Sequence, residues 1–265
     1  MLNWLPITFW ELLRTKLLKQ LCSPTKTIPL LKPSNSEAMK QQRATFEQLM
    51  EQLARRHVVQ AVFSDFLTLL VCAFSHGRRE EEYLSTIRKY EKPKAYRFSE
   101  ALGALTIEMT GDGTGMVELL GAYFEEHISH GHNGQFFTPQ HLCDMMARLM
   151  NPINPLEHIA DPACGSGRML MTMTKLNRYA RFYGADNDVN CAKMTVVNMT
   201  LNSMYGEVAW MNTLTNQFYS GWVIEPTIHG VPRVSQISEK QSHIHMKLPG
   251  KSNPVENVSS PAKGE

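Results

Sequence analysis

The seven residues Asp161-Pro162-Ala163-Cys164-Gly165-Ser166-Gly167 constrain the fold of this chain more than any other segment. They follow a short apolar run and precede a helix-like run, so we expect a strand that ends in a carboxylate, turns through glycines and leads into a helix. Glycine suits such a turn because it adopts positive φ and lets a ligand approach the backbone. An ordinary strand-to-helix turn is an equally good reading of the loop taken alone.

The segments around the loop favour a ligand site. About 20 residues beyond the glycine turn, residues 181–186 form a second expected strand that ends in Asp186, at the spacing where doubly wound folds present a carboxylate to ribose hydroxyls. Further strands and helices alternate with these, which predicts a parallel sheet with right-handed crossovers. The expected strands are 158–161, 181–186 and 206–211, and the expected helices are 141–150, 168–180 and 189–204. Ligands in such sheets lie beyond the carboxyl ends of the strands, where Asp161, Asp186 and Asn212 fall.

Three linked motifs then carry a family resemblance. Residues 134–139 read GQFFTP, residues 161–167 read DPACGSG and residues 183–186 read YGAD. In this order and spacing they resemble the S-adenosylmethionine site of adenine-N6 DNA methyltransferases, most of all the modification subunits of type I restriction-modification systems. The resemblance covers roughly residues 110–225. It implies an α/β fold with a Rossmann-like S-adenosylmethionine-dependent methyltransferase core, a truncated parallel sheet and a preceding helical domain.

The same resemblance assigns roles to individual residues. Gly165 and Gly167 would let the backbone approach the methionine part of the cofactor, and Asp161 would hold its ammonium group directly or through water. Asp186 would accept both ribose hydroxyls, and Asn187 would lie at the edge of the adenine pocket. The full set of predicted cofactor-binding residues is Phe137, Thr138, Asp161, Ala163, Gly165, Gly167, Asp186, Asn187 and Asn212.

Three of these positions have further readings. Asn212 matches the position where the family often has aspartate or asparagine for the adenine amino group. Thr138 would contact the cofactor carboxylate beside the wall formed by Phe137, although core packing is the simpler explanation for Phe136 or Phe137 alone. Asp188 is expected to cap the helix that follows it.

The chain departs from the family where the target base would bind. The family carries an N/D-P-P-F/Y tetrapeptide after the fourth strand, whose polar group binds the target amino group and whose aromatic ring stacks on the flipped base. Here the expected strand 219–224 is followed by Glu225-Pro226-Thr227-Ile228, with one proline and no aromatic ring. Glu225 and Pro226 are therefore the candidate catalytic residues of a degenerate motif. Losing the clamp on the amine would lower the rate of an in-line methyl transfer by orders of magnitude.

Two functions follow. The first is an adenine-N6 DNA methyltransferase of the type I modification-subunit kind, acting on DNA with a partner such as a specificity subunit that covers the truncated sheet edge. The second is a catalytically impaired S-adenosylmethionine-binding or DNA-associated protein. A dinucleotide site is a weaker third possibility, because the loop lacks the G-x-G-x-x-G pattern.

The sequence divides into four parts. Residues 1–33 combine an apolar amphipathic helix, either packed on the protein or bound to a membrane surface or partner, with a proline-containing linker. Residues 34–130 are expected to form a helical domain, 131–230 the S-adenosylmethionine-binding domain and 231–265 a disordered tail. In helix 141–150, helical periodicity places Leu142, Met145, Met146 and Leu149 inward.

Composition adds limits of its own. The net charge of +2 is too small to indicate a nucleic-acid partner by itself. Five scattered cysteines without a C-x-x-C pair argue against a metal site or disulfides and favour a reducing, cytoplasmic location. Charged residues interrupt the apolar start, so we expect no transmembrane segment.

Overall fold

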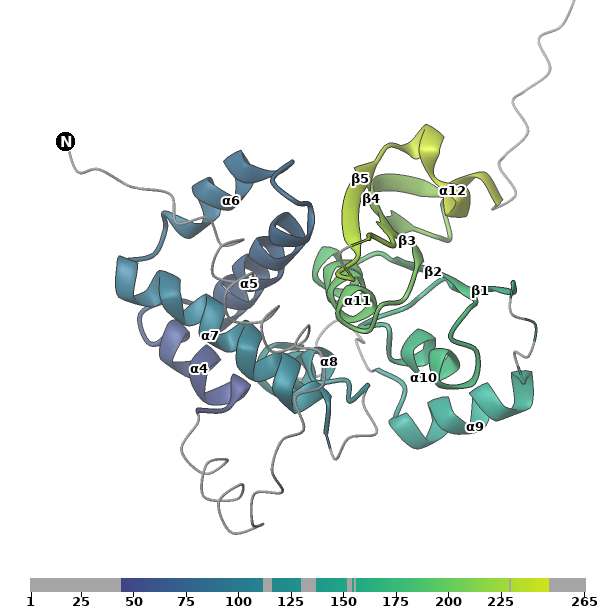
Figure 1. The fold of residues 1–265 in the computed structure, drawn as a ribbon, viewed down its shortest axis with the longest axis horizontal. Coiled ribbons are helices and arrows are strands. Elements are labelled where there is room, and N and C mark those ends of the chain that lie inside the picture. Colours follow the sequence, from purple (N-terminus) through teal and green to yellow (C-terminus); the bar gives the residue numbers. More distant parts are fainter. Residues whose placement is uncertain are drawn as a thin grey trace, which may run out of the picture.

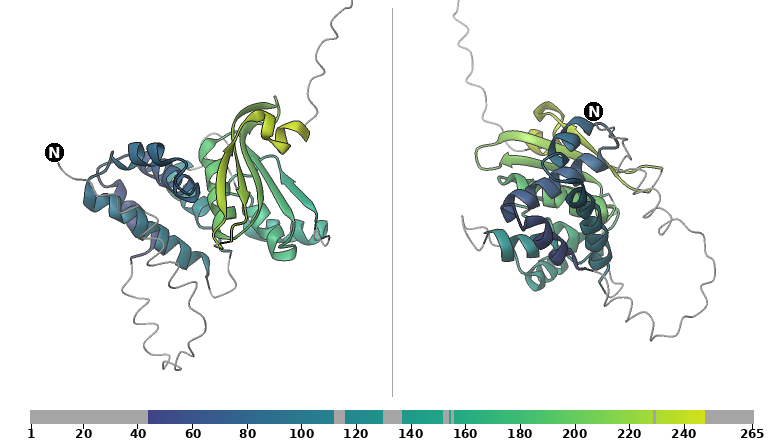
Figure 2. Two further views of the ribbon diagram at one scale, coloured as in Figure 1. Left: turned by 45° about the horizontal axis from the view of Figure 1, so that its top comes forward. Right: turned by 90° about the vertical axis from the view of Figure 1, so that its left-hand side faces the viewer.

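The computed structural model describes residues 44–111, 116–129, 137–151, 154, 156–228 and 230–247. The predicted helix within residues 1–33 and the motif residue Phe136 lie outside this part. A group of helices, α4 to α8, packs against one side of an α/β unit that contains a five-stranded sheet (Figure 1). The left view of Figure 2 shows the helical group beside the sheet unit, and the right view shows it in front of that unit.

The helical group forms around apolar side chains at helical spacing. α4 starts at a capping box between Thr45 and Gln48, and it buries the predicted inward residues Phe46, Leu49, Met50 and Leu53. α5 buries most of its length, as expected for a central helix. These helices are α4 (Phe46–Ala54), α5 (Val59–Phe74), α6 (Glu80–Ile87), α7 (Lys92–Met109), α8 (Leu120–Phe124) and the π-helix η1 (Glu125–Ser129). One continuous hydrophobic core joins this group to the sheet unit.

The first three strands confirm the predicted parallel arrangement. β1 pairs with β2 and β2 pairs with β3, both in parallel, and helices connect them. The elements of this part are α9 (Gln140–Met150), β1 (His158–Asp161), α10 (Arg168–Leu176), β2 (Arg181–Asp186), α11 (Val189–Leu201) and β3 (Gly206–Asn212). Asp188 caps α11 as predicted, because its side chain accepts the N–H groups of Asn190 and Cys191.

The rest of the sheet is antiparallel, which corrects the prediction of a parallel sheet. β4 (Gln217–Glu225) pairs antiparallel with β3, and β5 (Arg233–Ile237) pairs antiparallel with β4. The reason is the length of the connection: only residues 213–216 separate β3 from β4, whereas a parallel neighbour needs a crossover of a dozen or more residues. Asn216 adopts the left-handed conformation (φ 56°) in this tight turn.

Part of the predicted disordered tail is folded. Beyond β5, the 3-10 helix η3 (Glu239–Gln241) leads into α12 (His243–Lys247), which contacts β2 and β3. The buried carboxylate of Glu207 on β3 accepts the hydroxyl of Ser242 and the N–H group of His243. The prediction of disorder from 231 onward is therefore wrong for residues 233–247, because one buried acid on the sheet binds the start of α12.

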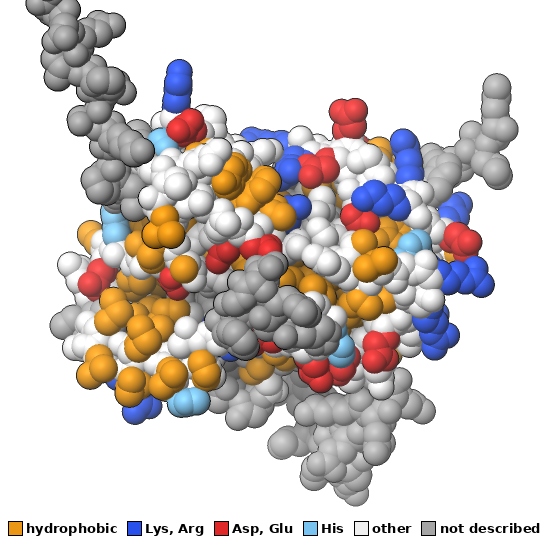
Figure 3. Space-filling model, turned by 180° about the vertical axis from the view of Figure 1, so that it is seen from behind, with side chains coloured by type: hydrophobic (Ala, Val, Ile, Leu, Met, Phe, Trp, Pro, Cys, Tyr) orange, Lys and Arg blue, Asp and Glu red, His pale blue; other side chains and the backbone are white. Residues whose placement is uncertain are grey.

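The side chains of α9 that were predicted to be buried are exposed. The buried residues of this helix are Cys143 and Ala147. The exposed apolar residues of α9 are Leu142, Met145, Met146, Leu149 and Met150. Hydrophobic side chains gather at the end of the molecule where α9 and β1 lie, at the lower left of Figure 3. β1 is also an edge strand of the sheet, so an apolar helix face and an open strand edge occur together.

No single helix in the described ranges is long and apolar enough to cross a membrane. Taken together, α4 and α5 are long and apolar enough for a membrane span, but the chain bends by 117° between them.

Candidate functional site

The predicted site residues converge at one edge of the sheet. Asp161 ends β1, Asp186 ends β2 and Asn212 ends β3. The strands are parallel, and their register pairs Asp161 with Gly184 and Asp186 with Trp210, so all three side chains lie at the carboxyl edge. This is where ligands bind in open α/β sheets.

The glycine loop after β1 is held in place by the end of β2. Asp186 accepts the N–H group of Gly165 through Oδ2 (2.9 Å) and that of Asp188 through Oδ1 (2.8 Å). Gly165 (φ 54°) and Gly167 (φ 83°) adopt the positive φ predicted from the motif. Asp186 therefore orders the loop, and the remaining lone pairs of its carboxylate stay available to a ligand hydroxyl.

Phe137 lies directly against this loop. A Cβ atom added to Gly165 would lie 2.8 Å from the Phe137 ring, so glycine is required for this close packing. Phe137 also stacks with Phe124 at a centroid distance of 6.0 Å, and its N–H group donates to Glu125 (2.9 Å). Thr138 is exposed, and its carbonyl oxygen accepts from Arg168. The structure thus brings the second half of the GQFFTP motif to the glycine loop.

A buried polar network supports the loop from beneath, and the sequence analysis did not identify it. Arg168, the first residue of α10, forms ion pairs with Glu118 (3.1 Å) and Glu125 (3.2 Å). Glu118 also accepts from Asn198 on α11, whose amide donates to the carbonyl of Ser166 as well. A glutamate within the apolar run 116–124 was the available signal, since a buried acid there requires a cationic partner.

The two acidic residues at the edge, Asp161 and Asp186, have no cationic partner among the residues that the structure describes. Burial raises the pKa of Asp161, and burial is also the main cause of the raised pKa of Asp186. The negative charges of Asp188 and Asp161 add to the raised pKa of Asp186, whereas the N–H groups of Asp188 and Gly165 lower it. Within the described ranges neither carboxylate forms an ion pair. Two partly desolvated carboxylates without a counter-ion favour a ligand that brings positive charge.

Three other predicted residues lie in the same region with partners of their own. Ala163 donates its N–H group to Asp161 (3.1 Å). Asn187 is exposed, and its carbonyl accepts from the indole of Trp210. The side-chain oxygen of Asn212 accepts the N–H groups of Leu214 and Thr215 (both 3.1 Å), so it stabilises the β3–β4 turn.

Glu225 and Pro226 lie elsewhere. Because β4 runs antiparallel to β3, its end pairs with the beginning of β3: Ile224 lies opposite Gly206 and Gln217 lies opposite Asn212. Glu225 is therefore separated from the carboxyl edge by the length of β3, on the order of 20 Å at about 3.3 Å per residue. It forms an ion pair with Arg233 on β5 (2.7 Å). The structure does not bring these two predicted catalytic residues together with the cofactor-binding set.

The described cysteines, Cys72, Cys143, Cys164 and Cys191, are all buried and free. Burial raises the pKa of the Cys164 thiol, inside the glycine loop, well above its ordinary value. This thiol stays protonated and packs as a small apolar group.

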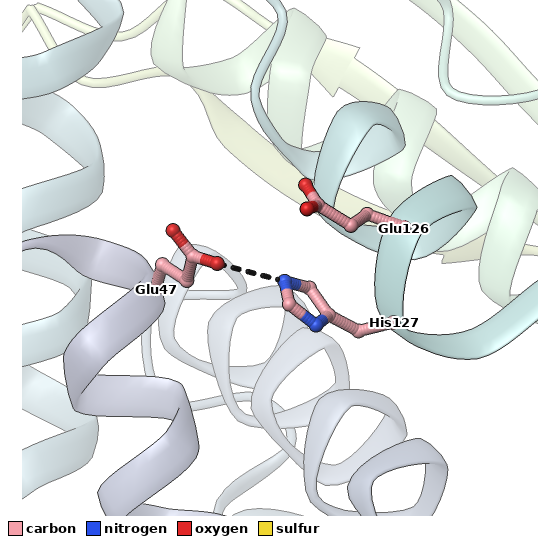
Figure 4. Close-up of side chains that lie close together, drawn as sticks. All are labelled: Glu47, Glu126 and His127. Atoms are coloured by element: carbon pink, nitrogen blue, oxygen red, sulfur yellow. Dashed lines mark hydrogen bonds and ion pairs between the residues drawn. The ribbon is translucent and has the colours of Figure 1, made fainter.

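One group of side chains has the composition of a metal site. Glu47 on α4 and Glu126 and His127 on η1 place their ligand atoms within 4.8 Å of one another (Figure 4). His127 Nε2 lies 3.0 Å from Glu47 Oε1, and its ring packs on Tyr123 at 4.4 Å. The contact between His127 and Glu47 joins η1 to α4, so packing between these helices is enough to explain why the three side chains lie together. Both glutamates are exposed.

Comparison with known proteins agrees with this geometry. Residues 116–231 match the family model described as N-6 DNA Methylase. The matched range contains the glycine loop, the network around Arg168 and the first four strands.

Among solved structures, the methyltransferase subunit of the type I restriction-modification system from Streptococcus thermophilus is similar to 55% of this chain at 14% identity, with a TM-score of 0.31. The match covers 37% of that protein's own length. The search of curated proteins found no match.

The buried ion pair between Arg168 and Glu118 predicts that removing one partner lowers the free energy of unfolding more than removing both. Arg168→Gln leaves the carboxylate of Glu118 buried without a cation, so we expect the free energy of unfolding to fall by about 3–5 kcal/mol. Adding Glu118→Gln removes that charge and should restore part of the loss. Urea denaturation measures both. Arg233→Gln, which breaks the exposed pair with Glu225, is the control and should cost about 1 kcal/mol or less. Equal losses in Arg168→Gln and the control would contradict the account.

The raised pKa of Asp161 predicts that replacing its carboxylate with a neutral amide stabilises the fold in a pH-dependent way. Above the unfolded-state pKa of about 3.9, the unfolded chain has lost the proton that the native carboxyl retains, so this residue lowers stability as pH rises. Asp161→Asn keeps the acceptor for the Ala163 N–H group. We therefore expect the ligand-free variant to melt at a higher temperature than wild type at pH 7, with the difference vanishing below about pH 4. A lower melting temperature of Asp161→Asn than of wild type at pH 7 would show that the ionised Asp161 carboxylate does not destabilise the native state.

Proposed function

We propose that this chain binds S-adenosylmethionine at the carboxyl edge of β1, β2 and β3, as the cofactor-binding part of an adenine-N6 DNA methyltransferase of the type I modification-subunit kind. The observation that carries the proposal is the pair Asp161 and Asp186: two partly buried carboxylates, without a cation among the described residues, beside a glycine loop with positive φ. S-adenosylmethionine carries a sulfonium and an ammonium group, and it offers ribose hydroxyls to a carboxylate. The donor set of the edge fits these groups.

The residues divide the binding tasks by chemistry. Asp161 would pair with the ammonium group, and Asp186 would accept the ribose hydroxyls while it continues to hold Gly165 and Asp188. Gly165 and Gly167 leave the backbone open to the ligand. Phe137 holds the loop in shape by packing on Gly165. When bound, the cofactor would supply an electrophilic methyl group on its sulfonium sulfur for transfer to an amine nitrogen of the acceptor.

The acceptor side of the reaction needs groups beyond this edge. Glu225 and Pro226 lie at the opposite end of the sheet, so they are not placed to hold an adenine amino group near the cofactor. We propose that a second polypeptide, of the kind that a specificity subunit represents, packs on the apolar face of α9 and the open edge of β1. Leu149 is 76% exposed and Leu156, just before β1, is 83% exposed, and exposed apolar side chains that gather on one face can mark an interaction site. The open edge adds backbone groups that another strand can pair with.

The placement of Glu225 also favours a second candidate function. A chain that kept the cofactor loop but lost the amine clamp would bind S-adenosylmethionine without transferring its methyl group. The two functions share the binding site and differ only in turnover.

Calorimetry followed by a transfer assay tests the proposal. Asp161→Asn removes one charge and keeps the backbone contact to Ala163, so we expect it to bind S-adenosylmethionine at least tenfold more weakly than wild type, the effect of losing about 1.4 kcal/mol of a charge-assisted contact. Glu225→Gln, at the far edge, should bind as wild type does. Wild-type protein that shows no binding would refute the proposed site.

The transfer assay uses tritiated S-adenosylmethionine and genomic DNA with the same preparations. Label in DNA adenine that is unaffected by Glu225→Gln supports the methyltransferase with acceptor groups outside β4. Binding without label supports the second candidate. Label that disappears in Glu225→Gln would contradict the placement of the acceptor groups given above.

A further inference from the structure

The helical group contains a cavity that the cofactor site does not use. It has a volume of about 820 Å³ and opens between the α4–α5 connection and the end of α6. It is lined by Arg55, Arg56, His57, Val58, Ala61, Ser64, Asp65, Lys89 and Tyr90. Seven of these nine residues carry a polar or charged group, so the cavity can bind a polar or charged ligand.

The charge in this cavity is positive and largely uncompensated. Arg55 and Arg56 are exposed, and in the described part of the chain no hydrogen bond or ion pair engages either guanidinium group. The lining contains one acid, Asp65, and Lys89 (2.8 Å) and the Tyr90 hydroxyl (2.8 Å) already bind it. Two guanidinium groups are thus left to face solvent in the same hollow.

The walls of the cavity are fixed by packing. Tyr90 is buried against Phe98 at a centroid distance of 4.7 Å, and His57 packs on Tyr90 at 5.0 Å. The Lys89 and Tyr90 contacts to Asp65 hold the end of α6 against α5. The basic side chains therefore project from a rigid base, which lowers the entropy cost of binding a ligand.

We propose that this cavity binds phosphate groups of the DNA backbone, and the proposal rests on DNA being the substrate. Guanidinium groups bind phosphate oxygens in a bidentate manner, and phosphate contacts position a protein on DNA without reading sequence. The cavity is wide and open and offers Val58 and Ala61 as its only purely aliphatic lining side chains, so it suits a polyanion that passes across it better than an enclosed small molecule.

Fluorescence anisotropy with a labelled mixed-sequence DNA duplex, measured at several salt concentrations, tests this inference on the full chain. Arg55→Gln with Arg56→Gln removes two positive charges from the cavity. We expect affinity to fall about tenfold near 100 mM salt and the slope of log affinity against log salt to become shallower by about 2, one per lost phosphate contact. The matched control is Lys175→Gln with Arg181→Gln, two exposed residues at the opposite edge of the sheet from the candidate ligand site, which removes the same charge. The control should keep the wild-type slope.

The outcomes separate this inference from the cofactor proposal. A lower affinity and shallower slope in the cavity variant alone support the inference, even if calorimetry shows no S-adenosylmethionine binding. Equal losses in both double variants would overturn it, since only general charge would then matter. Wild-type protein that binds the cofactor but not the duplex would also overturn it and would leave the cofactor site intact. Circular dichroism spectra of both variants, which change only exposed side chains, confirm that the fold is retained.

Discussion

The contact between Asp186 and the glycine loop organises the ligand edge. One carboxylate at the end of β2 accepts an N–H group from the loop after β1 and another from the turn into α11. It fixes two backbone segments relative to each other while keeping negative charge at the edge. Because burial raises its pKa, the arrangement stores an electrostatic cost in the ligand-free protein. A cationic ligand that binds there relieves this cost.

The direction of β4 determines what the edge can do. A four-residue turn after β3 sends the chain back along the sheet, so the next strand carries its end away from the cofactor residues. β1 and β5 are the two edge strands of the sheet, and β1 lies next to the exposed face of α9. The ligand edge and one of the two strand edges therefore meet at β1. An additional polypeptide at that position would lie beside the proposed cofactor and within reach of an acceptor.

Local signals predicted the parallel half of the fold well. The glycine loop, the acids that end β1 and β2 and the cap at Asp188 are set by short-range chemistry, and they lie where the sequence placed them. The errors arose where tertiary contacts decide. Periodicity alone put Leu149 inward, although the face of α9 that packs on the rest of the chain is the one with Cys143 and Ala147. The polar composition after residue 230 suggested disorder because the buried Glu207, which binds the start of α12, acts from a distant strand.

The orientation of β4 was within reach of the sequence. Residues 213–216 are too few for a crossover, so a hairpin was the only connection compatible with two strands there. The network of Arg168 with Glu118 was harder to predict, since it joins residues 50 positions apart. The assignment of Glu225 to a base-binding motif relied on its order along the chain, and order does not establish which edge of the sheet a residue reaches.

Hydrogen–deuterium exchange with and without S-adenosylmethionine locates the ligand on the backbone and so tests whether the cofactor binds at the glycine loop. We expect slower exchange on addition of the cofactor in residues 161–168 and 184–188, with no change in residues 217–237. Protection confined to the β4–β5 hairpin, or protection absent from the glycine loop at saturating cofactor, would contradict it.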